Sequence, residues 1–180
     1  KVDTAAPVIT ASYTVNENTT SDLATKSISL VATNETGAVT WTSLAGTDAA
    51  SFSIGSGADL GKLLFNGATN FEVKPSYSIT LTGTDLAGNA TVATPVSISV
   101  ANVNEIPSVA VPLVDQSTLL GQAFSYVVPL GSFIDPDAST TLIYSATLAN
   151  GAALSTATGW TGLVFNASTR TLSGVANDAT

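Results

Sequence analysis

The side chains available for chemistry in this sequence are almost all oxygen donors. The 180 residues contain no His, Cys or Met, which excludes histidine- and cysteine-based catalysis, structural zinc, haem ligation and thiol redox chemistry. Thirteen Asp and Glu remain, together with Asn amides. Such oxygens are the ligands of hard cations, above all Ca²⁺, which takes about six to eight of them. Paired carboxylates are also the catalytic groups of glycosidases.

The charge balance excludes two classes of partner. Asp and Glu outnumber the five Lys and Arg, the net charge is −8, and only 10% of the residues are charged. A nucleic-acid-binding protein needs a basic patch, which five scattered cations do not make. No apolar run approaches the roughly 20 residues of a membrane-spanning helix. We therefore expect neither nucleic acid binding nor membrane insertion.

Apolar residues occupy every second position in many segments, the pattern of half-buried β-strands. In the clearest segment, Tyr77, Ile79 and Leu81 share one face, while Ser and Thr occupy the other. The pattern predicts strands at 12–18, 26–33, 38–44, 62–67, 77–85, 94–103, 108–115, 122–130, 141–149, 161–166 and 170–175. Turn signals separate them, and no helical stripe is present, so the sequence predicts an antiparallel β-sandwich architecture.

A polar segment at 102–107 divides the chain. It holds two Asn and a Glu and ends in Pro107, which cannot donate to a strand ladder. We interpret it as a linker between two domains, residues 1–103 and 104–180. The first half supplies about seven strands, enough for a full sandwich, whereas the second supplies about five. We therefore expect the second sandwich to lack its last strands.

Both halves resemble known domain families. Residues 12–105 resemble a bacterial cadherin-like domain through VNEN (15–18), LVATNETGAVTWTSLAGTDAASFSI (30–54), GKLLFNGATNFE (61–72), SYSITLTGTDLAGNAT (76–91) and VNE (103–105). Residues 107–175 resemble a dystroglycan-type cadherin-like Ig domain through GQAFSY (121–126), FIDPD (133–137), LIYSATLANGAALS (142–155), Trp160 and TRTLSG (169–174). The resemblance implies tandem immunoglobulin-like (cadherin-type) Greek-key β-sandwiches from a large, repetitive, calcium-dependent bacterial surface adhesin.

The resemblance also implies Ca²⁺ bound at the joint between the two domains. The residues at the matching positions are Glu17, Asn70, Glu72, Asn102, Asn104, Glu105, Asp135 and Asp137. Carboxylates that converge this way repel one another unless a cation neutralises them. The family often has Asp at the positions of Asn70 and Asn102. Each amide removes a negative charge, so we expect a weaker affinity or one ion fewer.

A second, partial set of ligands matches the joint to an upstream domain. It consists of Asp3, Asn34, Glu35 and Asp85, and we expect it to be weak or empty without that domain. Acidic residues in loops are usually solvated surface. That is our interpretation of the remaining candidates, Asp22, Asp48, Asp59, Asp115 and Asp178.

Three functions follow from these features. The leading hypothesis is a calcium-rigidified structural or ligand-presenting segment of an extracellular adhesin on the bacterial cell surface. Its partners would be neighbouring domains of the same polypeptide and a cell-surface glycan or protein ligand. The alternative is a carbohydrate-binding module of a surface or polysaccharide-degrading protein, which needs an exposed aromatic platform. Trp41 and Trp160 are candidates for it, but their apolar strand context favours packing in the core. We do not expect an enzyme, because the candidate carboxylates already have a calcium interpretation.

Overall fold

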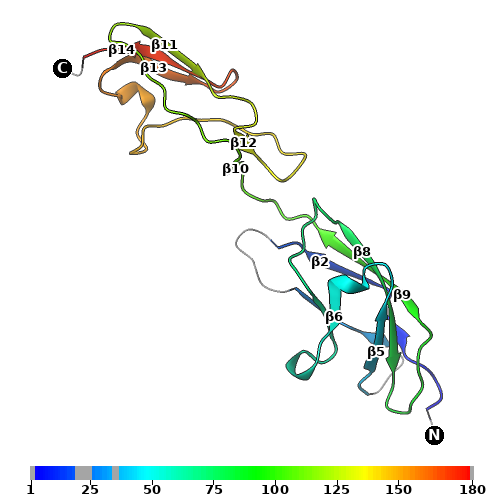
Figure 1. The fold of residues 1–180 in the computed structure, drawn as a ribbon. Coiled ribbons are helices and arrows are strands. Elements are labelled where there is room, and N and C mark those ends of the chain that lie inside the picture. The colour runs from blue at the N-terminus through cyan, green and yellow to red at the C-terminus, as the bar shows by residue number, and fades with distance from the viewer. Residues whose placement is uncertain (1–2, 19–25, 34–36, 179–180) are drawn as a thin grey trace. The chain divides into compact units, whose positions relative to one another are not determined.

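The computed structural model describes residues 3–18, 26–33 and 37–178 (Figure 1). These residues are strands and loops with three short 3₁₀ helices, η1 (Ala49–Ser51), η2 (Gly57–Asp59) and η3 (Leu154–Thr156). The chain divides into two compact units, Lys1–Glu105 and Ile106–Thr180, two residues beyond the division expected from the sequence. Among the described residues, no helix is long and apolar enough to cross a membrane.

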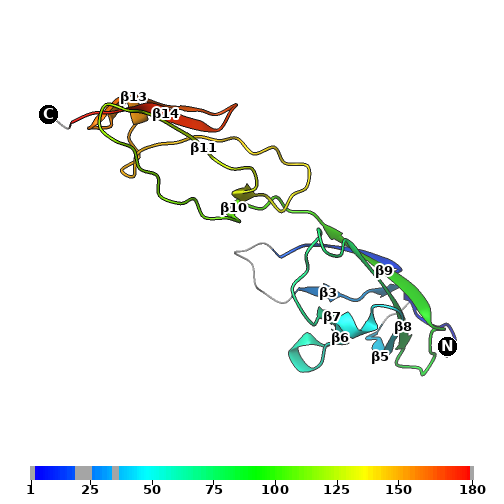
Figure 2. The same ribbon diagram turned by 45° about the horizontal axis from the view of Figure 1, so that its top comes forward.

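Unit 1 is a β-sandwich of two sheets. Its strands are β1 (Val8–Ile9), β2 (Ser12–Asn16), β3 (Ser27–Ser29), β4 (Ala32–Thr33), β5 (Thr40–Ala45), β6 (Phe52–Ile54), β7 (Lys62–Phe65), β8 (Ser76–Thr84) and β9 (Thr94–Ala101). One sheet has the order β2-β9-β8-β5 and the other β3-β7-β6, while β1 pairs with β4. Figure 2 shows β3, β7 and β6 side by side. All pairings are antiparallel except that of β2 with β9.

The core of unit 1 comes from the inward faces of both sheets. Tyr77, Ile79 and Leu81 of β8 are buried, as their alternation predicts, and so are Val96, Ile98 and Val100 of β9. Across the sandwich, the rings of Phe52 and Phe65 pack against Tyr77 with centroids 5.3 and 5.5 Å away. Edge-to-face contacts of this kind add to the area burial that stabilises the sandwich.

Unit 2 contains one main sheet among its described residues. Its strands are β10 (Ser108–Val109), β11 (Ala123–Val127), β12 (Phe133–Ile134), β13 (Trp160–Asn166) and β14 (Thr171–Ala176). The main sheet has the antiparallel order β11-β14-β13, and β10 pairs with β12. The β13–β14 register shifts between Thr161 and Val164, where β13 bulges.

Two strands expected from the sequence differ in the structure. Residues 141–149 form no strand, and of residues 108–115 only Ser108–Val109 pair. Apolar alternation suits a segment to one face of a sheet, but a strand also requires a partner for its backbone N–H and C=O groups. Within the part of unit 2 that the structure describes, no second sheet provides that partner.

Candidate metal site

The predicted ligand Glu17 is buried at the end of β2, with 1% of its surface exposed. The N–H of Glu17 donates to the carbonyl of Ala101 at 3.1 Å, which extends the β2–β9 ladder by one residue. Its Oε1 accepts from the Val103 N–H and its Oε2 from the Phe71 N–H, both at 2.7 Å. Glu17 therefore ties the end of β2 to two segments that carry other candidate ligands.

A buried polar pair fixes the loop beside Glu17. The Thr69 N–H and Oγ1 donate to Asn18 Oδ1 at 2.9 and 3.0 Å, and the Asn18 N–H donates to the Thr69 carbonyl. Both residues are buried. This pair holds the 69–72 loop against the end of β2. Asn18 belongs to the VNEN motif, but the motif alone does not indicate this pairing with Thr69.

Three predicted carboxylates converge at this end of unit 1. One carboxylate oxygen each of Glu17, Glu72 and Glu105 lies within 4.8 Å of the others. Glu17 and Glu105 are buried, and Glu72 is exposed. Such separations allow three oxygens to share one cation, and the donor set, oxygen only, matches the preference of Ca²⁺. The group therefore fits a calcium ion.

The predicted amide ligands have other partners. Asn70 Oδ1 accepts from the Val73 N–H at 2.7 Å and thereby closes the turn that carries Glu72. The Asn102 amide donates to Glu72 Oε1 at 3.1 Å, and the Asn104 amide to the Glu105 carbonyl at 3.0 Å. These contacts fix the turn that carries Glu72 and the Glu72 side chain itself, and the role of the three amides as ligands stays a prediction.

The two predicted ligands from unit 2 lie together in the loop after β12. The Asp137 N–H donates to Asp135 Oδ1 at 3.0 Å, an Asx-type turn, and Asp137 is buried. This turn presents two carboxylates from one short loop. Their role as ligands remains a prediction.

In the partial upstream set, Asp85 is bonded to a nearby loop residue and does not join a group of converging carboxylates among the described residues. Asp85 Oδ1 and Oδ2 accept from the backbone N–H and side-chain amide of Asn89 at 2.8 and 2.7 Å. The side-chain hydrogen bond from Asn89 is the main reason that the pKa of Asp85 lies below its usual value. Asp3 is exposed and accepts from the Ala5 N–H at 3.1 Å. Asn34 and Glu35 lie outside the described residues.

Asp48 is not the simple surface residue that the sequence suggested. Its Oδ1 accepts from Lys74 Nζ and its Oδ2 from the Ser78 N–H, both at 2.7 Å. Only 13% of its side chain is exposed. The Lys74 hydrogen bond, followed by that from Ser78, holds the pKa of Asp48 below its usual value. Nothing in the sequence pattern pairs Asp48 with a residue 26 positions away.

The aromatic side chains provide no exposed platform for stacking sugars. All twelve Phe, Tyr and Trp residues lie in the described segments, and each is buried or partly buried. Trp41 packs against the core of unit 1, and the ring of Trp160 lies 5.4 Å from that of Phe124. Carbohydrate-binding modules commonly need an exposed amphipathic ring, so this geometry gives the carbohydrate alternative no support.

Comparison with known proteins identifies similarities for both the sequence and the fold. Residues 107–180 match the family described as "Putative Ig domain", which covers nearly all of unit 2, and no curated protein matches the chain. Human protocadherin-24 EC1-2 is 18% identical, with TM-score 0.42, over 54% of this chain and 45% of its own. Mouse cadherin-23 EC22-24 is 15% identical, with TM-score 0.49, over 97% and 55%.

A further similar structure contains protocadherin gamma B2 extracellular cadherin domains 3-6. It is 17% identical, with TM-score 0.44, over 96% of this chain and 39% of its own. This chain thus spans between 39% and 55% of the length of these three solved chains.

Proposed function

We propose that the chain is a calcium-binding adhesion module of an extracellular, bacterial surface protein. Ca²⁺ binds to Glu17, Glu72 and Glu105 of unit 1, and Asp135 and Asp137 of unit 2 complete the site at the joint. The observation that supports this most directly is the convergence of the three glutamates within 4.8 Å. By occupying the joint, the ion restricts the angle between the two domains, so that a series of such domains projects as a rod.

The electrostatics of the three glutamates favour a cation. Like charges this close repel one another, and removing a carboxylate from water is costly unless it is paired or bound to a metal. For Glu17, two hydrogen bonds from backbone N–H groups offset part of that cost. Each of its oxygens still has lone-pair capacity for a cation, because a carboxylate offers about four acceptor sites.

Glu72 is the residue through which the proposal is best tested. It is exposed, so Glu72→Gln removes one negative charge without leaving a buried group unpaired. We expect the substitution to weaken Ca²⁺ binding by roughly tenfold or more, because affinity follows the number of charged ligands. Calorimetric titration of the full chain measures this. The matched control is Asp59→Asn, an exposed carboxylate whose partner is Lys62, and it should leave the affinity unchanged.

The proposed stiffening by Ca²⁺ can be measured separately from the binding. Small-angle scattering should give a narrower range of shapes in millimolar Ca²⁺ than in chelator, together with a higher melting temperature, because a ligand of the folded state stabilises it. Equal affinities for the wild type, Glu72→Gln and Asp59→Asn would refute the ligand assignment. Identical scattering with and without Ca²⁺ would refute the role in stiffening.

A further inference from the structure

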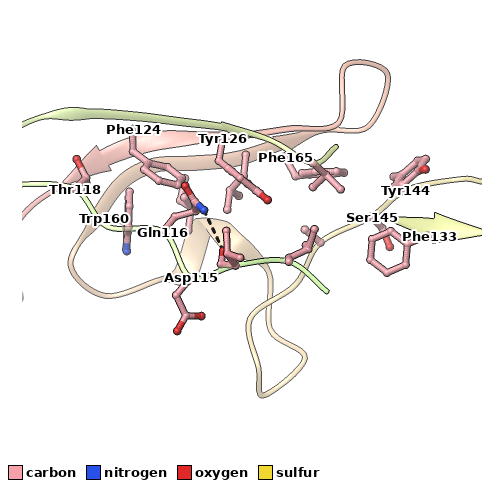
Figure 3. Close-up of a pocket in the computed structure, with 16 residues that line it drawn as sticks. Asp115, Gln116, Thr118, Phe124, Tyr126, Phe133, Tyr144, Ser145, Trp160 and Phe165 are labelled. Atoms are coloured by element: carbon pink, nitrogen blue, oxygen red, sulfur yellow. Dashed lines mark hydrogen bonds between the residues drawn. The ribbon is translucent and has the colours of Figure 1, made fainter. Parts of the chain in front are cut away.

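Unit 2 has an open apolar cleft. Its volume is about 450 Å³, and it lies between the inner face of the β11-β14-β13 sheet and two segments, 113–118 and 144–146. Figure 3 shows Phe124, Tyr126 and Phe165 on the sheet side, with Tyr144 and Gln116 across from them. The Asp115 carboxylate points away from the other side chains, so the cleft offers an apolar surface to its occupant.

Unit 2 leaves much of its apolar surface uncovered. Of the fourteen buried hydrophobic residues in the described chain, only Val128, Leu163 and Ala176 belong to unit 2. Of the eighteen exposed large hydrophobics, twelve belong to it, although unit 2 is the shorter unit. Two of these twelve, Leu113 and Val114, line the cleft. Extended exposed apolar surface marks an interaction site.

Unit 1 shows what covers the equivalent sheet in a complete sandwich. The two units share their arrangement: β3-β7-β6 corresponds in chain order to β11-β14-β13, and the β1–β4 pair to the β10–β12 pair. In unit 1 the β8–β9 hairpin covers this sheet, and Ile79, Leu81 and Ile98 of the hairpin are at most 1% exposed. The described residues of unit 2 contain no such hairpin.

Two segments of unit 2 correspond to the two strands that flank the hairpin in unit 1. The hairpin of unit 1 lies between β2 and β5, antiparallel to β5 and parallel to β2. By chain order, residues 110–116 of unit 2 correspond to β2 and residues 141–149 to β5. Tyr144, Ser145 and Ala146 line the cleft, whereas Ile143 is 94% exposed. Burial in the segment alternates in part, because Leu142, Tyr144 and Leu148 are partly buried and the residues directly beside each of them are exposed, yet the segment forms no ladder.

We propose that the cleft binds a β-hairpin with apolar residues at alternate positions, supplied by polypeptide outside these 180 residues. One strand of the hairpin pairs antiparallel with 141–149, and the other pairs parallel with 110–116. The inward side chains fill the cleft over Phe124 and Phe165, while main-chain hydrogen bonds complete the two flanking segments. This is strand addition, and its geometry follows the pairing of β8 and β9 in unit 1.

A peptide with the sequence of residues 76–101, the β8–β9 hairpin, serves as the probe. The full chain carries Trp41→Phe, so that Trp160, which lines the cleft, is its only tryptophan. We expect saturable binding with a blue shift of Trp160 fluorescence. Amide hydrogen exchange should slow at alternate residues within 141–147, because every second N–H of the segment enters the new ladder. A control peptide with Ser in place of Ile79, Leu81, Val96 and Ile98 should not bind.

A matched pair of variants locates the binding surface. Ala146 is exposed and lines the cleft, whereas Ala149 is exposed and three residues further along. Ala146→Glu should weaken peptide binding at least tenfold, and Ala149→Glu should leave it unchanged. Two results would overturn the proposal: no saturable binding of the apolar peptide, or binding without protection within 141–147. Self-association of the chain that Ala146→Glu abolishes, without peptide binding, would assign the cleft to a second copy instead.

Discussion

Single carboxylates in unit 1 connect segments that are distant in sequence. Glu17 bonds the backbone at Phe71 and Val103, and Asp48 bonds both Lys74 and the backbone at Ser78. Both therefore hold the segment 71–78, Glu17 at Phe71 and Asp48 at Lys74 and Ser78. Because a charged acceptor makes stronger hydrogen bonds than a neutral one, these contacts define how the loop before β8 approaches the glutamate cluster.

Asp48 should make the stability of unit 1 sensitive to acid. Its pKa in the folded state lies below the usual value, chiefly because of Lys74, so the unfolded chain binds a proton more readily. Its contribution to stability is therefore present above about pH 4, the ordinary range of an aspartate, and is lost as the pH falls through the lower folded pKa. Asp48→Asn should lower the melting temperature at pH 6. The gap between wild type and variant should close towards pH 2.

Thermal denaturation of both proteins from pH 2 to pH 6 measures this difference. Lys74→Met provides the matched control, since it removes the main cause of the lowered pKa while retaining the Ser78 hydrogen bond to Asp48. Lys74→Met should lower the melting temperature at pH 6 by part of the amount that Asp48→Asn does. A gap between wild type and Asp48→Asn that stays constant over the whole range would contradict the assignment.

The candidate site was predictable in part. The identities of Glu17, Glu72 and Glu105 follow from motif positions, and the structure brings these three together. What the amides do locally was not predictable: Asn70 closes its own turn through the Val73 N–H, and its place among the ligands stays a prediction. Whether a short amide bonds its own loop or a distant ion depends on local backbone angles, which a pattern of residue types does not specify. The same applies to Asp48, whose lysine partner comes from tertiary packing.

Among the elements, β8 and β9 contribute most to the core of unit 1, and a matched pair of leucines tests this. Leu81 in β8 is fully buried, whereas Leu86 in the following loop is 81% exposed. We expect Leu81→Ala to lower the free energy of unfolding by about 2–5 kcal/mol, from lost burial and a residual cavity. Leu86→Ala should change it by no more than about 0.5 kcal/mol.

Chemical denaturation of the two leucine variants, followed by Trp41 fluorescence in a Trp160→Phe background, gives both values. Trp41 packs against the core to which Leu81 belongs. Equal losses of stability in the two variants would mean that β8 does not carry the core as its burial indicates.

The segments that periodicity predicted as strands form strands only where a partner strand lies beside them. The alternation at 77–85 and 94–103 became β8 and β9, which pair with each other, and 170–175 became β14. The alternation at 141–149 is equally regular, but no partner lies beside it and no strand forms. Conversely, β1 has only two residues, which are too few to show an alternating pattern. It forms a strand because it pairs with β4. The pattern of side chains predicts which face of a strand is buried. Whether the backbone forms a hydrogen-bonded ladder depends on which strands lie beside it in the sheet.

At the scale of the molecule, the two units differ in how much apolar surface they bury. Eleven of the fourteen buried hydrophobic residues described lie in unit 1, and burying each large side chain contributes about 1.5–3 kcal/mol. Unit 2 keeps an open cleft of about 450 Å³ where unit 1 has a closed core. The two units should therefore unfold in separate transitions, with unit 2 unfolding first.

The two tryptophans allow each transition to be followed alone. Trp41 packs against the core of unit 1, and Trp160 lies in the cleft of unit 2 beside Phe124. In urea, the fluorescence of Trp160 in the Trp41→Phe variant should change at a lower midpoint than that of Trp41 in the Trp160→Phe variant. Coincident midpoints would mean that the chain unfolds as one cooperative body. A bound hairpin should raise only the Trp160 midpoint, because a ligand stabilises only the unit whose folded state it binds.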